Sequence, residues 1–205
     1  MKHVSGAWLP DDESDQVMLM AGARYQEHKL KAAMRYVKNY NLAVDVGAHC
    51  GLWSMQLEKL FSRVVAFEPL ERHLECYRKN TNGKCELYEV AIGETSGECS
   101  LKIVYGLSGQ SHILQTDGTT PMRTLDSYGF DGVDLLKIDT EGYELFVLKG
   151  AQALLKDQSP VIIVEQKPGH GKKYGLKDTE ALAFLEGIGY RQKKEIVGDY
   201  IMVRE

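Results

Sequence analysis

A glycine-rich turn and two acids are the first group of residues whose types and spacing could bind a small molecule. The turn spans Val44–Gly51, where Gly47 and Gly51 allow a tight bend and a close approach of the backbone to a ligand. Asp45 precedes both glycines, and Glu68 follows them by about 20 residues at the end of the next apolar run. This arrangement is typical of a nucleotide-like ligand held where strands end.

The charges of these acids distinguish two classes of cofactor. A dinucleotide presents a pyrophosphate to such a turn, and the carboxylate of Asp45 would repel it. S-adenosylmethionine (SAM) has no phosphate and carries a sulfonium and an ammonium group, which an acid attracts. Glu68 can accept both hydrogen bonds of a ribose diol. The turn therefore predicts a SAM site, with a nicotinamide cofactor as the alternative. His49 either contacts the methionine part of SAM or is a solvent-facing turn residue.

A second charged group follows the apolar run that starts at Val133. This run closes on Lys137, Asp139 and Glu141. Charged groups at a cleft shift one another's pKa, which can tune one acid to act as a general base. We predict that Asp139 or Glu141 is this base, and Lys137 is a further catalytic candidate. The alternatives are that Lys137 pairs internally with an acid and that Glu141, like Glu144, only favours a helix N-terminus.

A third acid ends the following apolar run. Glu165 is succeeded by a Pro-Gly turn and His170, and it is our reserve candidate for the base. Asp139, Glu165 and His170 could together bind a divalent ion through oxygen and imidazole ligands. The flexible turn explains these residues equally well, so a metal is possible but no metal site is predicted.

Alternating strands and helices must position these groups. Apolar runs start at Leu42, Val64, Cys85, Val133 and Val161, and helical patterns such as Leu70–Asn80 separate them. This alternation predicts an α/β fold with a doubly wound, mostly parallel, Rossmann-like sheet covered on both faces. The final runs, Gln192–Val197 and Tyr200–Val203, are so close that they must form an antiparallel hairpin.

Two segments depart from the alternation. Residues 1–40 are predicted to be an N-terminal helical extension, with one helix or a broken pair from Ser14 to about Lys38. Asp11, Asp12 and Glu13 suit the start of that helix. Residues 95–124 are predicted to be an inserted hairpin or lid with a Ser/Gly-rich loop. No repeat or linker divides the 205 residues, so we predict a single domain spanning 1–205.

The composition favours an ordinary globular protein. The chain is 43% hydrophobic and 26% charged, and its net charge of −4 gives no general attraction to a phosphate backbone. No nucleic-acid partner is therefore predicted, although Lys172-Lys173 and Arg191–Lys194 are short basic runs. The four cysteines lie far apart, which indicates neither disulfides nor a zinc site. No signal peptide or membrane-spanning run is evident, which predicts a soluble, cytoplasmic protein.

Several motifs together resemble the FkbM-type methyltransferase family. They are Val44–Gly51, Ala66–Pro69, Val90–Gly93, Thr124–Asp126, Lys137–Gly142 continuing to Leu148–Ala151, and Val164-Glu165. The resemblance covers about Leu42–Lys167. It implies a seven-stranded class I methyltransferase sheet, SAM as the methyl donor, and transfer to a hydroxyl oxygen of a sugar or small metabolite.

The resemblance also implies roles for individual residues. The residues expected to hold the cofactor are Asp45, Gly47, Gly51 and Glu68, with Ala91 near the adenine and Asp139 and Glu141 beside the transferred methyl. The segments before Tyr40 and after Pro168 have no counterpart, so the acceptor stays open.

Three other functions remain as alternatives. They are an NAD-dependent oxidoreductase, a non-catalytic SAM-binding domain, and a nucleic-acid base methyltransferase. The last is disfavoured because Asp139–Gly142 replaces the Pro-Pro-aromatic turn of amino-group methyltransferases.

Overall fold

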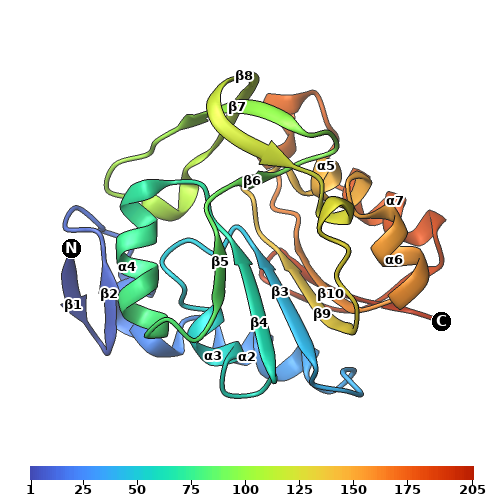
Figure 1. Cartoon of the computed structure of the whole chain (residues 1–205), viewed down its shortest axis with the longest axis horizontal. Helices are drawn as coiled ribbons and strands as arrows, with labels where there is room; N and C mark the ends of the chain where they lie inside the picture. Colours follow the sequence, from blue (N-terminus) through green and yellow to red (C-terminus); the bar gives the residue numbers. More distant parts are fainter.

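A seven-stranded sheet forms the centre of the computed structural model, which describes residues 1–205 (Figure 1). Its strands are β3 (Leu42–Val46), β4 (Arg63–Phe67), β5 (Glu86–Tyr88), β9 (Val133–Ile138), β10 (Val161–Glu165), β11 (Tyr190–Ile196) and β12 (Asp199–Arg204). Their order across the sheet is β11-β12-β10-β9-β3-β4-β5. Only β12 runs against the others, since it pairs antiparallel with both β10 and β11. The predicted α/β fold, with a mostly parallel sheet and an antiparallel C-terminal strand, is confirmed.

Helices cover both faces of this sheet, which explains why its central strands are apolar throughout. Every residue of β3 and of β10 is buried, as is usual for parallel strands between two helical layers. The helices are α1 (Gln16–Ala21), α2 (Glu27–Ala33), α3 (Ser54–Leu57), α4 (Glu71–Thr81), α5 (Glu144–Lys149), α6 (Gln152–Gln158) and α7 (Glu180–Gly187). Short 3-10 helices occupy Gly22–Arg24, Ser108–Gln110, Leu125–Tyr128 and His170–Tyr174.

Successive strand residues enter two separate hydrophobic cores. Val44 and Val46 of β3 pack with residues of α5, α6 and α7, which lie together at the right of Figure 1. Ala43 packs instead with residues of α2, α3 and α4. The side-chain period of two in a strand therefore assigns each strand position to one helical layer. Asp45 faces the same side as Ala43.

The N-terminal segment contains a hairpin that the sequence did not predict. Strands β1 (Lys2–Val4) and β2 (Ala7–Leu9) pair antiparallel before the broken pair of helices α1 and α2. Asp15 caps α1 by accepting hydrogen bonds from the amides of Val17 at 2.8 Å and Met18 at 3.2 Å. The helix therefore begins two residues after the predicted Ser14, and the residue that satisfies its first amides is Asp15 rather than one of the preceding acids.

The inserted segment forms a second, smaller sheet. Strand β8 (His112–Arg123) lies between β6 (Ala91–Ile92) and β7 (Gly97–Lys102), and β7 and β8 form the predicted hairpin. In Figure 1 this sheet lies at the top of the molecule, beyond one end of the central strands.

None of the helices combines the length and the apolar character that crossing a membrane requires.

A buried ion pair joins the N-terminal helices to the sheet. Lys29 of α2 pairs with Asp199 at the start of β12, and the two side chains are only 6% and 4% exposed. Removing one partner of such a pair leaves the other charge buried without compensation.

We expect Asp199→Ala to lower the free energy of unfolding by about 3–5 kcal/mol, because Lys29 is then buried and unpaired. Urea denaturation measures this loss. The matched control is the double variant Lys29→Met, Asp199→Leu, which removes both charges and should recover most of the stability. A loss below about 1 kcal/mol for Asp199→Ala would show that the pair behaves like an exposed one.

Candidate functional site

A cavity with about 610 Å³ of open space lies at the carboxyl ends of β3, β4 and β9. This is the edge at which doubly wound sheets bind ligands. The strand ends contribute Gly47, Glu68 and Asp139 to its wall, β6 contributes Ala91, and the inserted segment contributes residues such as Ser108 and Ile113. The glycine-rich turn and the inserted segment therefore enclose one site, which we call the first cavity.

Gly47 lies where the turn after β3 touches the end of β9. Its φ is +75°, and a Cβ on this residue would lie 1.9 Å from the carbonyl oxygen of Asp139. The amide of Asp139 donates in turn to the carbonyl oxygen of Val46 at 3.1 Å. Gly47 is thus required both by its left-handed conformation and by this close approach.

Gly51 lets the turn pack closely against α4. A Cβ there would lie 2.8 Å from Cδ2 of Tyr77 on that helix. Gly51 does not line the first cavity. Its predicted contact with the cofactor remains a prediction.

Glu68 lines the first cavity and also holds the glycine-rich turn in place. Its Oε2 accepts a hydrogen bond from the amide of His49 at 2.9 Å, and its Oε1 accepts one from the amide of Leu70 at 3.0 Å. The Nδ1 of His73 lies 3.1 Å from Oε1. A carboxylate can accept about four hydrogen bonds, so Glu68 keeps capacity for a ligand hydroxyl.

Asp45 lies beneath the turn and is fully buried. Its Oδ1 is 3.1 Å from Nζ of Lys137, and its Oδ2 accepts a hydrogen bond from Oγ of Ser54 at 2.7 Å. Asp45 does not line the first cavity. The direct attraction to the cofactor predicted for Asp45 therefore stays a prediction, while the internal pairing considered for Lys137 is present.

The ammonium group of Lys137 is held in its charged form. Burial lowers its pKa, but the carboxylates of Asp45 and Asp139 more than reverse this and raise the pKa above its usual value. The Nζ also donates to the carbonyl oxygen of Gly47 at 3.2 Å and lies 3.9 Å from Asp139. Lys137 thus links the ends of β3 and β9 as a cation rather than as a base.

A second cavity, with about 500 Å³ of open space, adjoins the first. Five residues line both cavities and so mark their boundary: Gly47, His49, Gly109, Asp139 and Glu141. The remaining wall includes Tyr25, Trp53, Lys137 and Lys167. Tyr25 belongs to the N-terminal segment, so that segment forms one side of the second cavity.

The two acids at the boundary are poorly solvated. Burial raises the pKa of Asp139, and the negative charge of Glu165 adds to this shift. Burial likewise raises the pKa of Glu141 to about 7, again with a contribution from Glu165. Of the two glutamates considered for the helix start, Glu144 lies in the first turn of α5, and it accepts hydrogen bonds from the amides of Thr140 and Gly142 in the preceding loop, each at 2.9 Å.

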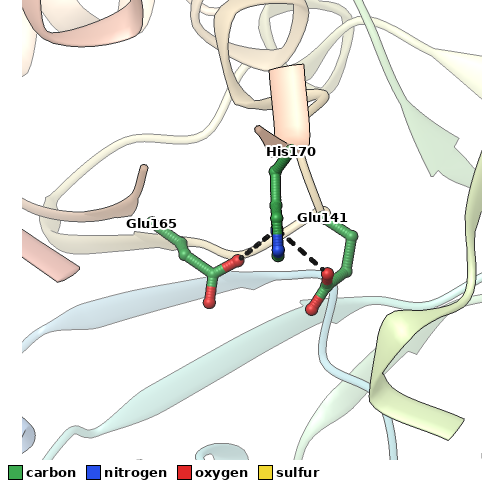
Figure 2. Close-up of side chains that lie close together, drawn as sticks. All are labelled: Glu141, Glu165 and His170. Atoms are coloured by element: carbon green, nitrogen blue, oxygen red, sulfur yellow. Dashed lines mark ion pairs between the residues drawn. The ribbon is translucent and has the colours of Figure 1, made fainter. Parts of the chain in front are cut away.

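Glu165 ends β10 with a side chain that is only 1% exposed. Lys167 places its Nζ 2.5 Å from Oε1 of Glu165. Burial raises the pKa of Glu165, but His170 and Lys167 outweigh it and lower the pKa to about 2. The Nδ1 of His170 lies 3.6 Å from Glu165 and 3.2 Å from Glu141, as Figure 2 shows. The structure therefore places Glu165 and His170 beside Glu141. The possible ion site considered from the sequence combined them with Asp139 instead.

Contacts between distant segments close the first cavity, and the sequence did not predict them. The Oγ of Ser108 lies 2.7 Å from Nε2 of His49, and the amide of Ser108 donates to Oε2 of Glu13 at 3.1 Å. The Ser/Gly-rich composition marked this loop as a lid but did not single out Ser108. Nothing in the sequence indicated that His73 or Glu13 lies near the site, because their contacts depend on the fold.

The chain is similar in sequence to one protein family. The family model described as "Methyltransferase FkbM domain" matches residues 45–192. No curated protein matches the chain in sequence.

Three solved structures share the fold. The FkbM methyltransferase of Methylobacillus flagellatus KT is 19% identical with a TM-score of 0.51, and the match covers 79% of this chain and 42% of that one. The precorrin-6y C5,15-methyltransferase of Geobacter metallireducens GS-15 is 14% identical with a TM-score of 0.54 and 97% of each chain covered. The N-methyltransferase NodS of Bradyrhizobium japonicum WM9, solved with S-adenosylhomocysteine, is 9% identical with a TM-score of 0.53, covering 94% of this chain and 90% of that one.

We expect Gly47→Ala to be more destabilising than Gly83→Ala, a matched control. Both glycines have a left-handed φ, but a Cβ on Gly83 meets nothing within 4 Å. The control should lose about 1–2 kcal/mol of unfolding free energy through backbone strain alone. Gly47→Ala should lose a further 1–3 kcal/mol or so, because its Cβ overlaps Asp139. Urea denaturation of both variants is the measurement, and equal losses would contradict the proposed close approach.

Proposed function

Because the chain belongs to the FkbM methyltransferase family, we propose that it transfers the methyl group of SAM to a hydroxyl oxygen of a sugar or small metabolite. The observation that carries this proposal is the pair of adjoining cavities, with Asp139 and Glu141 at their boundary. Methyl transfer needs a donor and an acceptor held in line, and two cavities with a shared wall permit that alignment.

The first cavity suits the adenosine part of SAM. Glu68 can accept a hydrogen bond from a ribose hydroxyl, and Ala91 offers an apolar surface to the adenine. The sulfonium would then lie toward the boundary, where the carboxylates of Asp139 and Glu141 attract positive charge. The pyrophosphate of a nicotinamide cofactor would meet the same two acids and be repelled, which favours SAM over NAD. NodS, which shares the fold, was solved in complex with S-adenosylhomocysteine.

The second cavity suits a hydroxylated acceptor. Tyr25, which is partly exposed, offers an aromatic ring to the C–H groups of a sugar ring, while Lys167, whose side chain is 38% exposed, can donate a hydrogen bond to a hydroxyl oxygen. Two basic runs could contact a nucleic acid, Lys172-Lys173 and Arg191–Lys194. Neither run lines the first or the second cavity. A small acceptor is therefore our proposal.

The residues at the boundary would align the acceptor and remove its proton. SAM supplies an electrophilic methyl group, and the acceptor oxygen displaces it from sulfur, releasing S-adenosylhomocysteine. Asp139 is our proposed base for the hydroxyl proton, because it lines both cavities and its carboxylate is 21% exposed. Lys137, 3.9 Å away, orients this carboxylate.

Calorimetric titration should show binding of SAM and S-adenosylhomocysteine and none of NAD or NADP. Glu68→Gln should weaken SAM binding about 10–100-fold, because a hydrogen bond to a charged acceptor is lost. Glu71→Gln is the matched control, since Glu71 is exposed and lines neither cavity. Binding of NAD without SAM would overturn the proposal.

Asp139→Asn should reduce turnover about 100–10,000-fold, the usual contribution of a general base, while SAM still binds. Transfer of an isotope-labelled methyl group from SAM to a panel of sugars and hydroxylated metabolites, followed by mass spectrometry, measures it. Asp134→Asn makes the same change near the other end of β9 and should leave turnover unchanged.

Near-normal turnover of both Asp139→Asn and Glu141→Gln with SAM bound would exclude these acids as the base. Tight binding of SAM without transfer to any acceptor would instead support a non-catalytic SAM-binding domain.

A further inference from the structure

Glu141, Glu165 and His170 form a compact group of potential metal ligands beside the second cavity. Glu141 follows β9, Glu165 ends β10, and His170 starts the 3-10 helix His170–Tyr174. One ligand atom from each residue lies within 4.8 Å of the other two. Figure 2 shows the three side chains converging on a common point from these three elements.

The spacing of the ligand atoms is close to that around a metal ion. Nδ1 of His170 is 3.2 Å from Oε2 of Glu141 and 3.6 Å from Oε2 of Glu165. Ligands about 2.1 Å from an ion, at octahedral or tetrahedral angles, lie roughly 3.0–3.4 Å apart. The three ligand atoms all lie within 4.8 Å of one another, so an approach of the two carboxylates would let them share one ion.

The cluster contains buried polar atoms without hydrogen-bond partners. The side chain of Glu165 is 1% exposed, and its Oε2 has no hydrogen-bond partner, while Oε1 contacts only Nζ of Lys167. The Nδ1 of His170 is likewise without one. Buried polar groups are normally satisfied, because leaving them unpaired costs free energy. A cation at the point where they converge would satisfy all of these atoms together.

The charges of the cluster leave a net attraction for a cation. Lys167 balances one of the two carboxylates, with its Nζ 2.5 Å from Oε1 of Glu165. The second carboxylate and the imidazole of His170 then face the centre of the cluster, and an ion that binds there takes the place of any proton on Nδ1. Two oxygen ligands with one imidazole nitrogen suit a divalent ion such as Mn²⁺, since carboxylates alone favour Mg²⁺ or Ca²⁺ and imidazole favours transition metals.

We propose that Glu141, Glu165 and His170 bind a divalent ion of the Mn²⁺ type, whose open coordination positions face the second cavity. Three protein ligands leave positions free, and Glu141 lines that cavity. An acceptor hydroxyl bound there would be polarised by the ion and would lose its proton to Asp139 more easily. This role toward the acceptor rests on the proposed function, whereas binding of the ion does not.

The experiment measures ion binding directly on the full chain. After EDTA treatment and dialysis, the protein is titrated with MnCl₂, and the loss of the free Mn²⁺ signal in electron paramagnetic resonance gives the bound fraction. We expect one ion per chain and at least a 10-fold loss of affinity in E165Q and in H170Q. His28→Ala removes an exposed imidazole on α2 and should leave the affinity unchanged. H170Q changes a partly exposed residue, so it keeps the test valid if E165Q does not fold.

Two results would overturn the proposal. One is the absence of stoichiometric binding of Mn²⁺, Mg²⁺ and Zn²⁺ at millimolar concentration, and the other is unchanged Mn²⁺ affinity in both variants. For the role toward the acceptor, EDTA should abolish methyl transfer and Mn²⁺ should restore it, and an unchanged rate in EDTA would exclude that role. Binding of Mn²⁺ by a chain that does not bind SAM would refute the proposed function and leave the metal site standing.

Discussion

The buried pair of Asp45 and Lys137 is the interaction on which the candidate site depends. These residues are direct neighbours across the parallel ladder of β3 and β9. Two opposite charges in the interior are tolerated only when they satisfy each other and the surrounding polar groups, and Ser54 and the carbonyl oxygen of Gly47 complete this set. The pair therefore holds the turn after β3 against the end of β9, where the boundary between the two cavities lies.

Much of the fold could be predicted because its signals are local. Apolar runs such as Val161–Val164 are buried on both faces and alternate with helices, so the parallel sheet follows from the pattern of the chain. The strand ends that carry Glu68 and Asp139 could be located in the same way. The hairpin of β1 and β2 was missed, since two strands of three residues carry almost no periodicity.

The partners of the site residues could not be predicted, because they depend on register and on long-range contacts. Spacing places Asp45 at the end of a strand, but only the alignment of β3 with β9 directs it toward Lys137. Glu141 and Glu144 are equivalent candidates in the sequence, yet only Glu144 lies in the first turn of α5. Glu13 meets a residue of the inserted segment far along the chain, a contact that no local pattern can indicate.

The two cavities are built from different parts of the polypeptide, and this division bears on how such an enzyme can diversify. The region that matches the family, residues 45–192, supplies most of the first cavity, whereas Met18, Tyr25 and Gln26 of the second cavity lie outside it. The buried pair of Lys29 and Asp199 fixes α2, which directly follows these wall residues, to the central sheet. Under the proposed function, exchange of one short N-terminal segment would change the wall of the acceptor cavity, whereas every residue that lines the donor cavity comes from the family region.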